Sequence, residues 1–270
     1  MSQKIDSLIE IQKISKQCIL IKFGADALAA INTKKGIIVI DAGISSGLTA
    51  RYRKIIENEF EGNDFTYVIN SHGHPDHYGG NGIFVEARII GHVNCLQEIS
   101  EQLNNPGKRL KNLSNVVEDY DQQLKASESN TVEWKEIFTQ KTRYLNAYND
   151  AKNLVPVKQP DITFSDRLNI DMGDATLEMI YFGKCHSNSD ILIYIPEMAI
   201  LFTGDLFSKY GRPDINDTLM TDRERWHQAI QWIEKRMINI KTIIDGHGDI
   251  LSVDDLMSFN NNILNKSLKE

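Results

Sequence analysis

Three histidines and one aspartate fall within six consecutive positions, as His72, His74, Asp76 and His77. The whole chain has seven histidines, so nearly half of them lie in this segment. Imidazole nitrogen and carboxylate oxygen are the ligands that borderline metals such as zinc take. Residues two apart in an extended segment point the same way, so His72 and His74 can bind one ion. Pro75 turns the chain and lets Asp76 and His77 face a second ion, so the segment predicts a hydrolytic metal centre on a loop.

Three further polar residues, His186, Asp205 and His247, each follow an apolar run of strand length. Each is flanked by glycine or another small residue, which lets the backbone come close to an ion. Residues that do chemistry commonly lie on loops held by a sheet. These three are therefore further candidate ligands.

Short apolar and β-branched runs, separated by Gly, Asp, Pro or Ser, predict strands. They are Cys18–Phe23, Gly36–Asp41, Phe65–Asn70, Arg88–Ile90, Asp161–Phe164, Leu168–Asp171, Thr176–Phe182, Ile191–Ile195, Ala199–Thr203 and Lys241–Asp245. Helical spacing predicts helices over Gly47–Phe60 and Asp222–Met237, a small one near Tyr78–Phe84, and a last one that starts at the capping pair Ser252 and Asp255. Two groups of strands with helices around them predict an α/β (α+β) fold with two sheets covered by helices.

The stretch from residue 93 to residue 155 has a helical, polar pattern, with breaks expected at 104–107 and 126–130. One interpretation is that these helices pack on the core. The other is a helical insertion that forms a lid, with Trp134, Phe138, Tyr144 and Tyr148 as wall residues of a pocket. The length of 270 residues favours one domain with this insertion.

Composition limits the classes of partner that the protein can bind. The formal net charge of −7 disfavours a nucleic-acid surface, which needs a basic stripe. No segment approaches about 18 uninterrupted apolar residues, so no membrane span is expected. Three widely spaced cysteines do not form a disulfide framework, and no signal peptide is visible, so a cytoplasmic protein is expected. The expected partner is a small-molecule substrate.

With these motifs in their order, the chain resembles the metallo-β-lactamase superfamily. The resemblance rests on His-x-His-x-Asp-His from His72 to His77, then His186, then Asp205 in Leu-Phe-Thr-Gly-Asp, then His247 in Gly-His-Gly. It covers nearly all of the chain except residues 93–155. The resemblance implies an αββα sandwich of two mixed sheets with a two-metal site at one edge.

The resemblance also implies the ligands. The first metal would be held by His72, His74 and His186, the second by Asp76, His77 and His247, and Asp205 would bridge both. A carboxylate has two oxygens and can span ions about 3.5–4 Å apart, which agrees with this role for Asp205. Asp41 matches an early aspartate of the family that supports the site, because ligating histidines need an outer partner. Zinc is the expected metal, and iron or manganese could take its place.

The expected function is a metal-dependent, dinuclear zinc hydrolase that uses a metal-bridging hydroxide on a small ester, thioester, lactone or amide. Asp76 is the catalytic candidate, because it can orient the nucleophile and move its proton. β-Lactam hydrolysis stays open, although the named β-lactamases often place Cys or Ser where Asp205 stands. The same fold is also compatible with an iron oxidoreductase similar to persulfide dioxygenases, and with a protein that binds metal without catalysis.

Two histidines and one cysteine are expected to be structural. His92 follows a strand and His227 lies within a predicted helix, and neither occupies a ligand position of the motif. Cys185 stands next to His186, which already fills the motif position. Cys185 is therefore expected to pack away from the metal.

Overall fold

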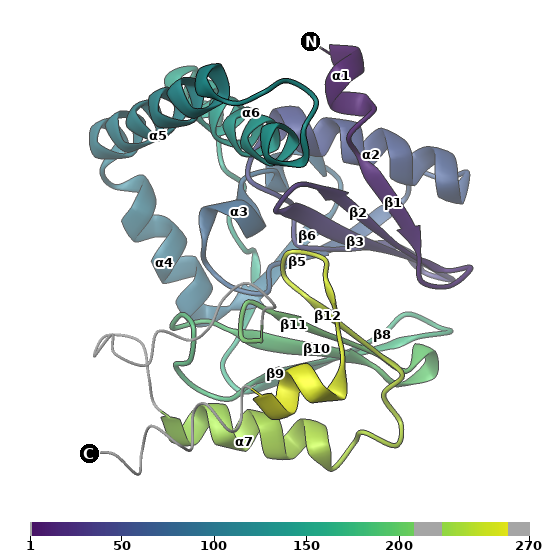
Figure 1. Cartoon of the computed structure of the whole chain (residues 1–270). Coiled ribbons are helices and arrows are strands. Elements are labelled where there is room, and N and C mark those ends of the chain that lie inside the picture. Colours follow the sequence, from purple (N-terminus) through teal and green to yellow (C-terminus); the bar gives the residue numbers. More distant parts are fainter. Residues whose placement is uncertain (1, 208–222, 259–270) are drawn as a thin grey trace.

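The computed structural model describes residues 2–207 and 223–258, and its strands form two sheets (Figure 1). The first has seven strands in the order β1-β2-β3-β4-β5-β6-β7. They are β1 Glu10–Lys13, β2 Cys18–Phe23, β3 Asp26–Thr33, β4 Gly36–Ile40, β5 Phe65–Ile69, β6 Arg88–His92 and β7 Ile162–Phe164. Pairing is antiparallel from β1 to β4 and parallel from β4 to β7, so this sheet is mixed.

The second sheet has six strands in the order β13-β12-β11-β10-β9-β8. They are β8 Arg167–Asp171, β9 Thr176–Tyr181, β10 Ile191–Ile195, β11 Ile200–Gly204, β12 Thr242–Asp245 and β13 Ile250–Leu251. β11 and β12 are parallel and the other pairs are antiparallel, so this sheet is mixed as well.

The main core lies between the two sheets, because alternate residues of the central strands point to opposite faces. In β4, Ile38 and Ile40 pack toward the second sheet, whereas Ile37 and Val39 pack toward the helices outside. In β10, Ile191 and Ile193 face the first sheet. Strands buried on both faces have nearly continuous apolar sequences, which explains why these runs were predicted as strands.

Helices cover both outer faces and complete the αββα sandwich that was predicted. α2 Ser46–Phe60 and α6 Val132–Lys152 pack on the first sheet, and α7 Arg223–Glu234 packs on the second. Ile5 of α1 Ser2–Asp6 packs into the same core as α2 and α6. The remaining helices are α3 Pro75–Tyr78, α4 Val93–Leu103 and α5 Pro106–Ala126, with 3-10 turns at Asn81–Ile83 and Pro196–Met198.

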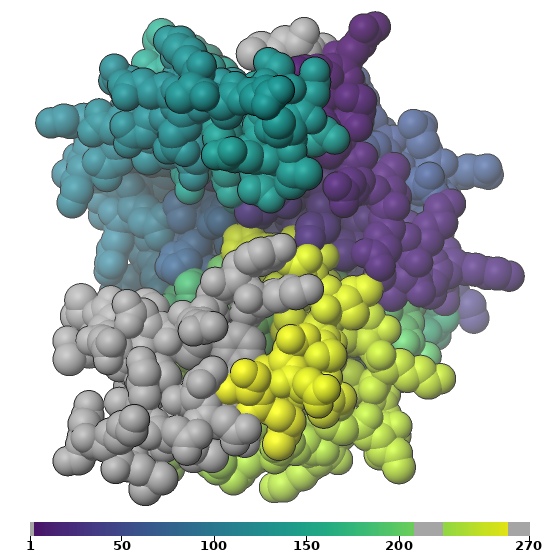
Figure 2. Space-filling model, viewed as in Figure 1, coloured from purple at the N-terminus to yellow at the C-terminus, as the bar shows by residue number. Residues whose placement is uncertain are grey.

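The stretch from 93 to 155 forms three helices, with the two predicted breaks between them. α5 and α6 pack along each other and form a continuous ridge at the top of the face seen in Figure 2. α5 has no fully buried residue, whereas α6 buries one side against α2 and the first sheet. The insertion is therefore attached to the sandwich mainly through α6.

In the first half of the chain, three local predictions were incomplete or wrong. The strand β3 was missed, because its sequence Asp-Ala-Leu-Ala-Ala-Ile-Asn-Thr is rich in alanine, which has low strand propensity. β1 was also missed, being short, polar and exposed at the sheet edge. The helix predicted near Tyr78–Phe84 begins earlier, at Pro75, and continues after a break as a 3-10 turn.

Toward the end of the chain the predictions agree with the structure in part. The helix predicted over Asp222–Met237 is present as α7 but ends at Glu234, and residue 222 lies outside the described residues. The short strand β13 was not predicted. Ser252 and Asp255 cap each other's backbone N–H groups, as predicted, and residues 253–258 are helical. No helix in the described ranges is long and apolar enough to cross a membrane.

Candidate metal centre

The histidine-rich loop leaves the carboxyl end of β5. The backbone stays extended at His74, where φ is −87° and ψ is 148°, and Pro75 begins α3. Proline suits the first helical position, because its missing N–H is not needed there and its φ is already helical. His72 and His74 therefore lie before the turn, and Asp76 and His77 lie in the first turn of α3. The change of direction at Pro75 is the one predicted.

The other three candidate ligands come from the second sheet. Asp205 and His247 follow β11 and β12, which are parallel neighbours, so both residues lie at the same sheet edge. His186 lies in the loop between β9 and β10. All seven candidates converge in three overlapping groups whose ligand atoms lie within 4.8 Å of one another: His72, His74 and His186; His72, His77 and Asp205; Asp76, His77 and His247.

Asp205 lies between the histidines of the two sheets. Its Oδ1 is 3.6 Å from Nε2 of His77. Its Oδ2 is 3.2 Å from Nε2 of His247 and 3.7 Å from Nε2 of His186. The two carboxylate oxygens thus face different imidazoles, which is the arrangement a bridging ligand needs. Nε2 of His186 is also 3.1 Å from Nδ1 of His74.

The donor atoms fit cations. Nε2 of His72, Nε2 of His77 and Oδ1 of Asp205 are buried and have no hydrogen-bond partner among the described residues. A buried polar atom without a partner costs about 1–3 kcal/mol, so native structures rarely leave three of them together. Imidazole nitrogens and a carboxylate oxygen directed at one point form the donor set of a divalent transition metal.

Outer partners fix the orientation of two of these histidines. Asp41 accepts hydrogen bonds from the backbone N–H and the hydroxyl of Ser71, both at 2.8 Å, and lies 2.9 Å from Nδ1 of His77. Nδ1 of His247 lies 2.8 Å from the carbonyl oxygen of Ala25. In both rings Nδ1 is taken and Nε2 is directed at the cluster, which is how proteins hold a metal-binding tautomer. Asp41 thus lies where the prediction of a supporting aspartate placed it.

The protonation states of the metal-free cluster differ from one histidine to the next. Burial lowers the pKa of His72 well below its usual value, and it lowers the pKa of His186 to about 4, so both rings are neutral at pH 7. Burial opposes ionisation of Asp205, but the neighbouring imidazoles, above all His77, hold its pKa well below the usual range. Although burial lowers it, the hydrogen bond to Asp205 raises the pKa of His247 to about 9. In the absence of a cation, a proton on His247 balances the Asp205 carboxylate.

Glycine is required at two positions next to Asp205. A Cβ at Gly246 would lie 2.3 Å from Oδ1 of Asp205 and 2.9 Å from Cε1 of His77. Gly204 has a φ of +52°, and a Cβ there would lie 2.8 Å from Cβ of Ser71. The two sheets approach this closely because these positions lack side chains. At both positions the backbone lies against other residues of the cluster, and the expected approach to an ion stays a prediction.

Arg143 is a site residue that the sequence analysis missed. It comes from α6 and is 3% exposed. Its Nη2 is 3.4 Å from Oδ2 of Asp76 and its Nε is 3.7 Å from Oδ1 of Asp26. Asp26 is completely buried and accepts hydrogen bonds from the N–H of Ile44 and the hydroxyl of Tyr52. The insertion therefore places a buried cation against a candidate ligand, a contact that helical spacing alone could not reveal.

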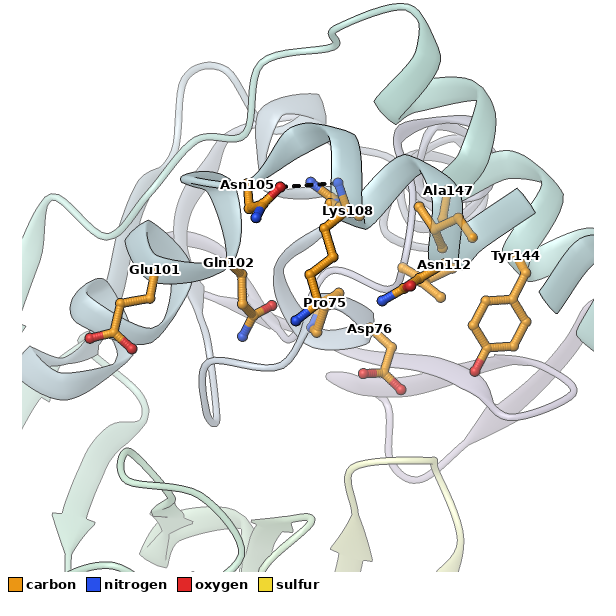
Figure 3. Close-up of a pocket in the computed structure, with 12 residues that line it drawn as sticks. Pro75, Asp76, Glu101, Gln102, Asn105, Lys108, Asn112, Tyr144 and Ala147 are labelled. Atoms are coloured by element: carbon orange, nitrogen blue, oxygen red, sulfur yellow. Dashed lines mark hydrogen bonds between the residues drawn. The ribbon is translucent and has the colours of Figure 1, made fainter. Parts of the chain in front are cut away.

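A cavity of about 480 Å³ opens beside Asp76 (Figure 3). Its walls come from α3, α4, α5 and α6, so the insertion supplies most of it. Of the four predicted wall residues, only Tyr144 lines this cavity. Trp134 and Phe138 instead stack on each other with ring centroids 5.0 Å apart and belong to the core, and Tyr148 lines a separate hollow. Two of the four predicted wall residues therefore face the sandwich and not the cavity.

The remaining histidines and the cysteines have structural contacts. His92 caps α4 through the N–H of Asn94, lies 2.8 Å from the carbonyl oxygen of Ser165, and stacks on Tyr181. His227 lies on α7 away from the cluster, as expected. All three cysteines are in the described ranges, are buried and form no disulfide, and Cys185 packs in the core between the second sheet and α7.

Comparisons with known proteins agree with this arrangement. The model of a family described as "Metallo-beta-lactamase superfamily" matches residues 28–247. A Bacillus cereus protein named "Metallo-beta-lactamase type 2" is 22% identical over 220 residues, which cover 82% of this chain and 66% of that protein. The chain thus spans just under two thirds of this relative's length. A protein of the same name from Bacillus sp. (strain 170) is also 22% identical, with 65% of its length covered.

Solved structures share the fold. A metallo-beta-lactamase from Pontibacter korlensis superposes with a TM-score of 0.60 and 19% identity, over 95% of this chain and 99% of that one. A metallo-beta-lactamase of Pseudomonas aeruginosa in a mono-zinc form gives 0.63 and 12% identity, over 96% of each chain. A sec-alkylsulfatase from Pseudomonas sp. gives 0.69 and 13% identity, over 97% of this chain and 43% of that one.

The family match covers well over half of the chain, and the sandwich and the histidine motif agree with it. The chain therefore belongs to the metallo-beta-lactamase superfamily. Members of this superfamily are mostly metal-dependent hydrolases, and the His and Asp groups at the edge of the two sheets are candidate sites for divalent metals.

Proposed function

We propose that the protein is a metal-dependent hydrolase that holds two divalent cations, zinc in the first instance. One would be bound by His72, His74 and His186 and the other by Asp76, His77 and His247, with Asp205 shared between them. The observation that carries the proposal is the cluster of buried donor atoms without hydrogen-bond partners around Asp205. When bound, two such cations lower the pKa of a shared water and polarise a carbonyl or similar electrophile.

Asp76 is the proposed catalytic residue of the chain. Its Oδ1 lies 3.8 Å from Nε2 of His77, inside the cluster, and its side chain also lines the cavity. Burial raises the pKa of Asp76, but His77, Arg143 and His247 together lower it below its usual value. Asp76 is therefore a carboxylate at neutral pH and can orient a water molecule and accept its proton. Arg143 restrains the other oxygen and so limits the rotation of this side chain.

The proposed substrate is a small ester, thioester, lactone or amide. A cavity of about 480 Å³ lies within the usual range of small-molecule sites, roughly 300–1,000 Å³. We further propose that the helices of the insertion act as a lid over this cavity, that the chain from 1 to 270 is one domain, and that it works in the cytoplasm without nucleic acid or membrane as a partner. Three buried cysteines that form no disulfide support the proposal of a reducing compartment.

β-Lactam hydrolysis is the second candidate, because the relatives from the two Bacillus sources carry the name metallo-beta-lactamase. An iron oxidoreductase similar to persulfide dioxygenases is the third, because the same nitrogen and oxygen donors also bind iron. Fold alone does not separate these activities.

The decisive test begins with elemental analysis of protein purified without added metal. Chelator-treated protein is then reloaded with zinc, iron or manganese and assayed on esters, thioesters, lactones, amides, a β-lactam and a persulfide. The Asp76→Asn variant should keep much of its metal and lose turnover by roughly 10²–10⁴-fold. Asp119→Asn, an exposed change on α5, is the matched control. Stoichiometric iron with oxygen uptake on the persulfide would overturn the hydrolase proposal, and turnover of Asp76→Asn within a few-fold of the parent would overturn the role of Asp76.

A further inference from the structure

The polar groups of the cavity beside Asp76 divide into two sets. Some are engaged within the protein. Gln102 accepts from the hydroxyl of Tyr78 at 2.9 Å and donates to the carbonyl oxygen of Gly73 at 2.8 Å. Asn105 caps α5 by accepting from the N–H of Lys108. Glu101 accepts a hydrogen bond from Gln97. These side chains thus have contacts that hold the walls in place.

The second set has no such partner. Among residues 2–207 and 223–258, no hydrogen bond or ion pair is found for the side-chain nitrogens of Lys108, Arg109 and Asn112 or for the hydroxyl of Tyr144. All four line the same cavity. Figure 3 shows Lys108 reaching from α5 toward Pro75, and the hydroxyl of Tyr144 on the same side as the carboxylate of Asp76. The cavity therefore offers hydrogen-bond donors that are not used by the fold.

Two of these donors are cationic. The protein has a net charge of −7, yet the two consecutive cations Lys108 and Arg109 lie in the first turns of α5 and face one cavity. Two carboxylates also line the cavity: Asp76 is paired with Arg143, whereas the exposed Glu101 accepts only from the neutral amide of Gln97 and keeps its charge. A negatively charged ligand group is the chemistry that complements this surface.

The rest of the lining is apolar. Ile44, Pro75, Leu113 and Ala147 line the cavity, together with the ring of Tyr144. Tyr144 is itself held by stacking on Tyr120, with ring centroids 5.8 Å apart. A ligand that fills the cavity thus needs an apolar body with one polar end at Asp76 and one at the cations.

We propose that this cavity is the specificity pocket of the enzyme and that it selects substrates with a second, anionic group. Lys108 and Arg109 bind that group, which is a carboxylate or a phosphate, while Tyr144 and Leu113 contact the apolar body and the bond to be hydrolysed lies at Asp76. This inference rests on the proposed hydrolase function, and it adds the substrate class: esters, thioesters, lactones or amides that carry a remote negative charge.

The test compares matched substrates. Aryl esters are prepared whose acyl chains have equal length and end in a carboxylate, a phosphate or an uncharged carboxamide. The variant Lys108→Gln/Arg109→Gln is compared with the parent, and Lys111→Gln, an exposed change on the same helix, is the control. We expect the preference for charged over uncharged substrate, measured as the ratio of kcat/KM, to fall about tenfold in the double variant through KM. The preference should also weaken with salt in the parent.

A second readout does not need turnover. Binding of glutarate and of phenyl phosphate to the metal-loaded protein is measured by calorimetry, and the double variant should bind them about tenfold more weakly than the parent or the control.

Unchanged binding in the double variant would show that the anions bind only to the metals, and would overturn the inference. A parent that hydrolyses the uncharged ester as well as the charged ones would also overturn it, while leaving the hydrolase function intact. Anion binding that depends on Lys108 and Arg109, in a protein that hydrolyses none of the compounds, would instead reject the hydrolase function. A difference between the carboxylate and phosphate series identifies the anion.

Discussion

The substitution Arg143→Met tests whether the buried cation of α6 holds the insertion to the sandwich. Arg143 is 3% exposed and lies between Asp26, which is fully buried, and Asp76. Methionine keeps most of the volume of the side chain but removes its charge. The carboxylate of Asp26 then has hydrogen bonds from Tyr52 and Ile44 but no cation. Removing one partner of a buried ion pair is costly, because the other charge stays buried without compensation.

The distances set the magnitude. Breaking a buried pair costs about 3–5 kcal/mol in general. Here the nitrogen–oxygen distances are 3.7 and 3.4 Å, longer than strong hydrogen bonds, so we expect the lower end, about 3 kcal/mol. Solvent screening does not reduce this figure for the Asp26 pair, since neither side chain is exposed beyond 4%. At about 2–4 °C per kcal/mol for a protein of this size, the Tm falls by roughly 6–12 °C.

The assay is thermal melting of chelator-treated protein, which removes the contribution of bound metal. Lys135→Met, an exposed change on the same helix, is the control and should shift the Tm by less than about 2 °C. In the double variant Asp26→Asn/Arg143→Met the uncompensated charge is gone, so its loss of stability should be smaller than the sum of the two single losses. A Tm for Arg143→Met within about 2 °C of the parent, or additive losses in the double variant, would refute the reasoning.

Further predictions concern the metal centre. Asp41→Asn should weaken metal binding about 10–100-fold in a competition titration with a chelator, because the amide no longer fixes the ring of His77; unchanged affinity would contradict this. Gly246→Ala should reduce metal content measured by elemental analysis, since its Cβ would displace Asp205, and full occupancy would show that the loop adapts. The pKa of His247 is raised to about 9 in the folded protein from a usual value of 6.5, so its stabilisation is complete below about pH 6.5 and is lost as the pH rises through about 9. The Tm of metal-free protein should therefore fall over this range and His247→Gln should flatten the profile, whereas a Tm that rises from pH 6.5 to pH 9 would contradict the assignment.

Much of the fold could be predicted from local pattern. Ile37 to Ile40 and Ile191 to Ile195 are runs that only a strand buried on both faces uses, and the structure has β4 and β10 there. The strand Asp26–Thr33 was missed, because its alanines carry little strand propensity. What makes it a strand is its place between β2 and β4, where its backbone pairs on both sides. This pairing depends on neighbouring strands, and a prediction from short sequence segments does not include them.

The candidate site divides in the same way. The placement of His72, His74, Asp76 and His77 could be predicted from the sequence, because an extended stretch and a proline turn are local structures. The order of His186, Asp205 and His247 along the chain added a family resemblance, which the comparisons support. Which residues of the insertion meet this site was not decided by spacing. α6 presents Arg143 and Tyr144 toward Asp76, whereas Trp134 and Phe138 of the same helix pack into the core.

The amino-acid order of this protein was enough to specify the types of donor atoms and the loops that carry them, since those depend on neighbours a few residues apart. The sandwich was implied by the resemblance. Only the packing of α5 and α6 against the sandwich decided the buried contact of Arg143 with Asp26 and Asp76 and the cationic cavity of Lys108 and Arg109. The physical reason is that a helix offers several faces of similar composition. The face that becomes buried is selected by the shape and charge of what it packs against, and that partner comes from distant parts of the chain.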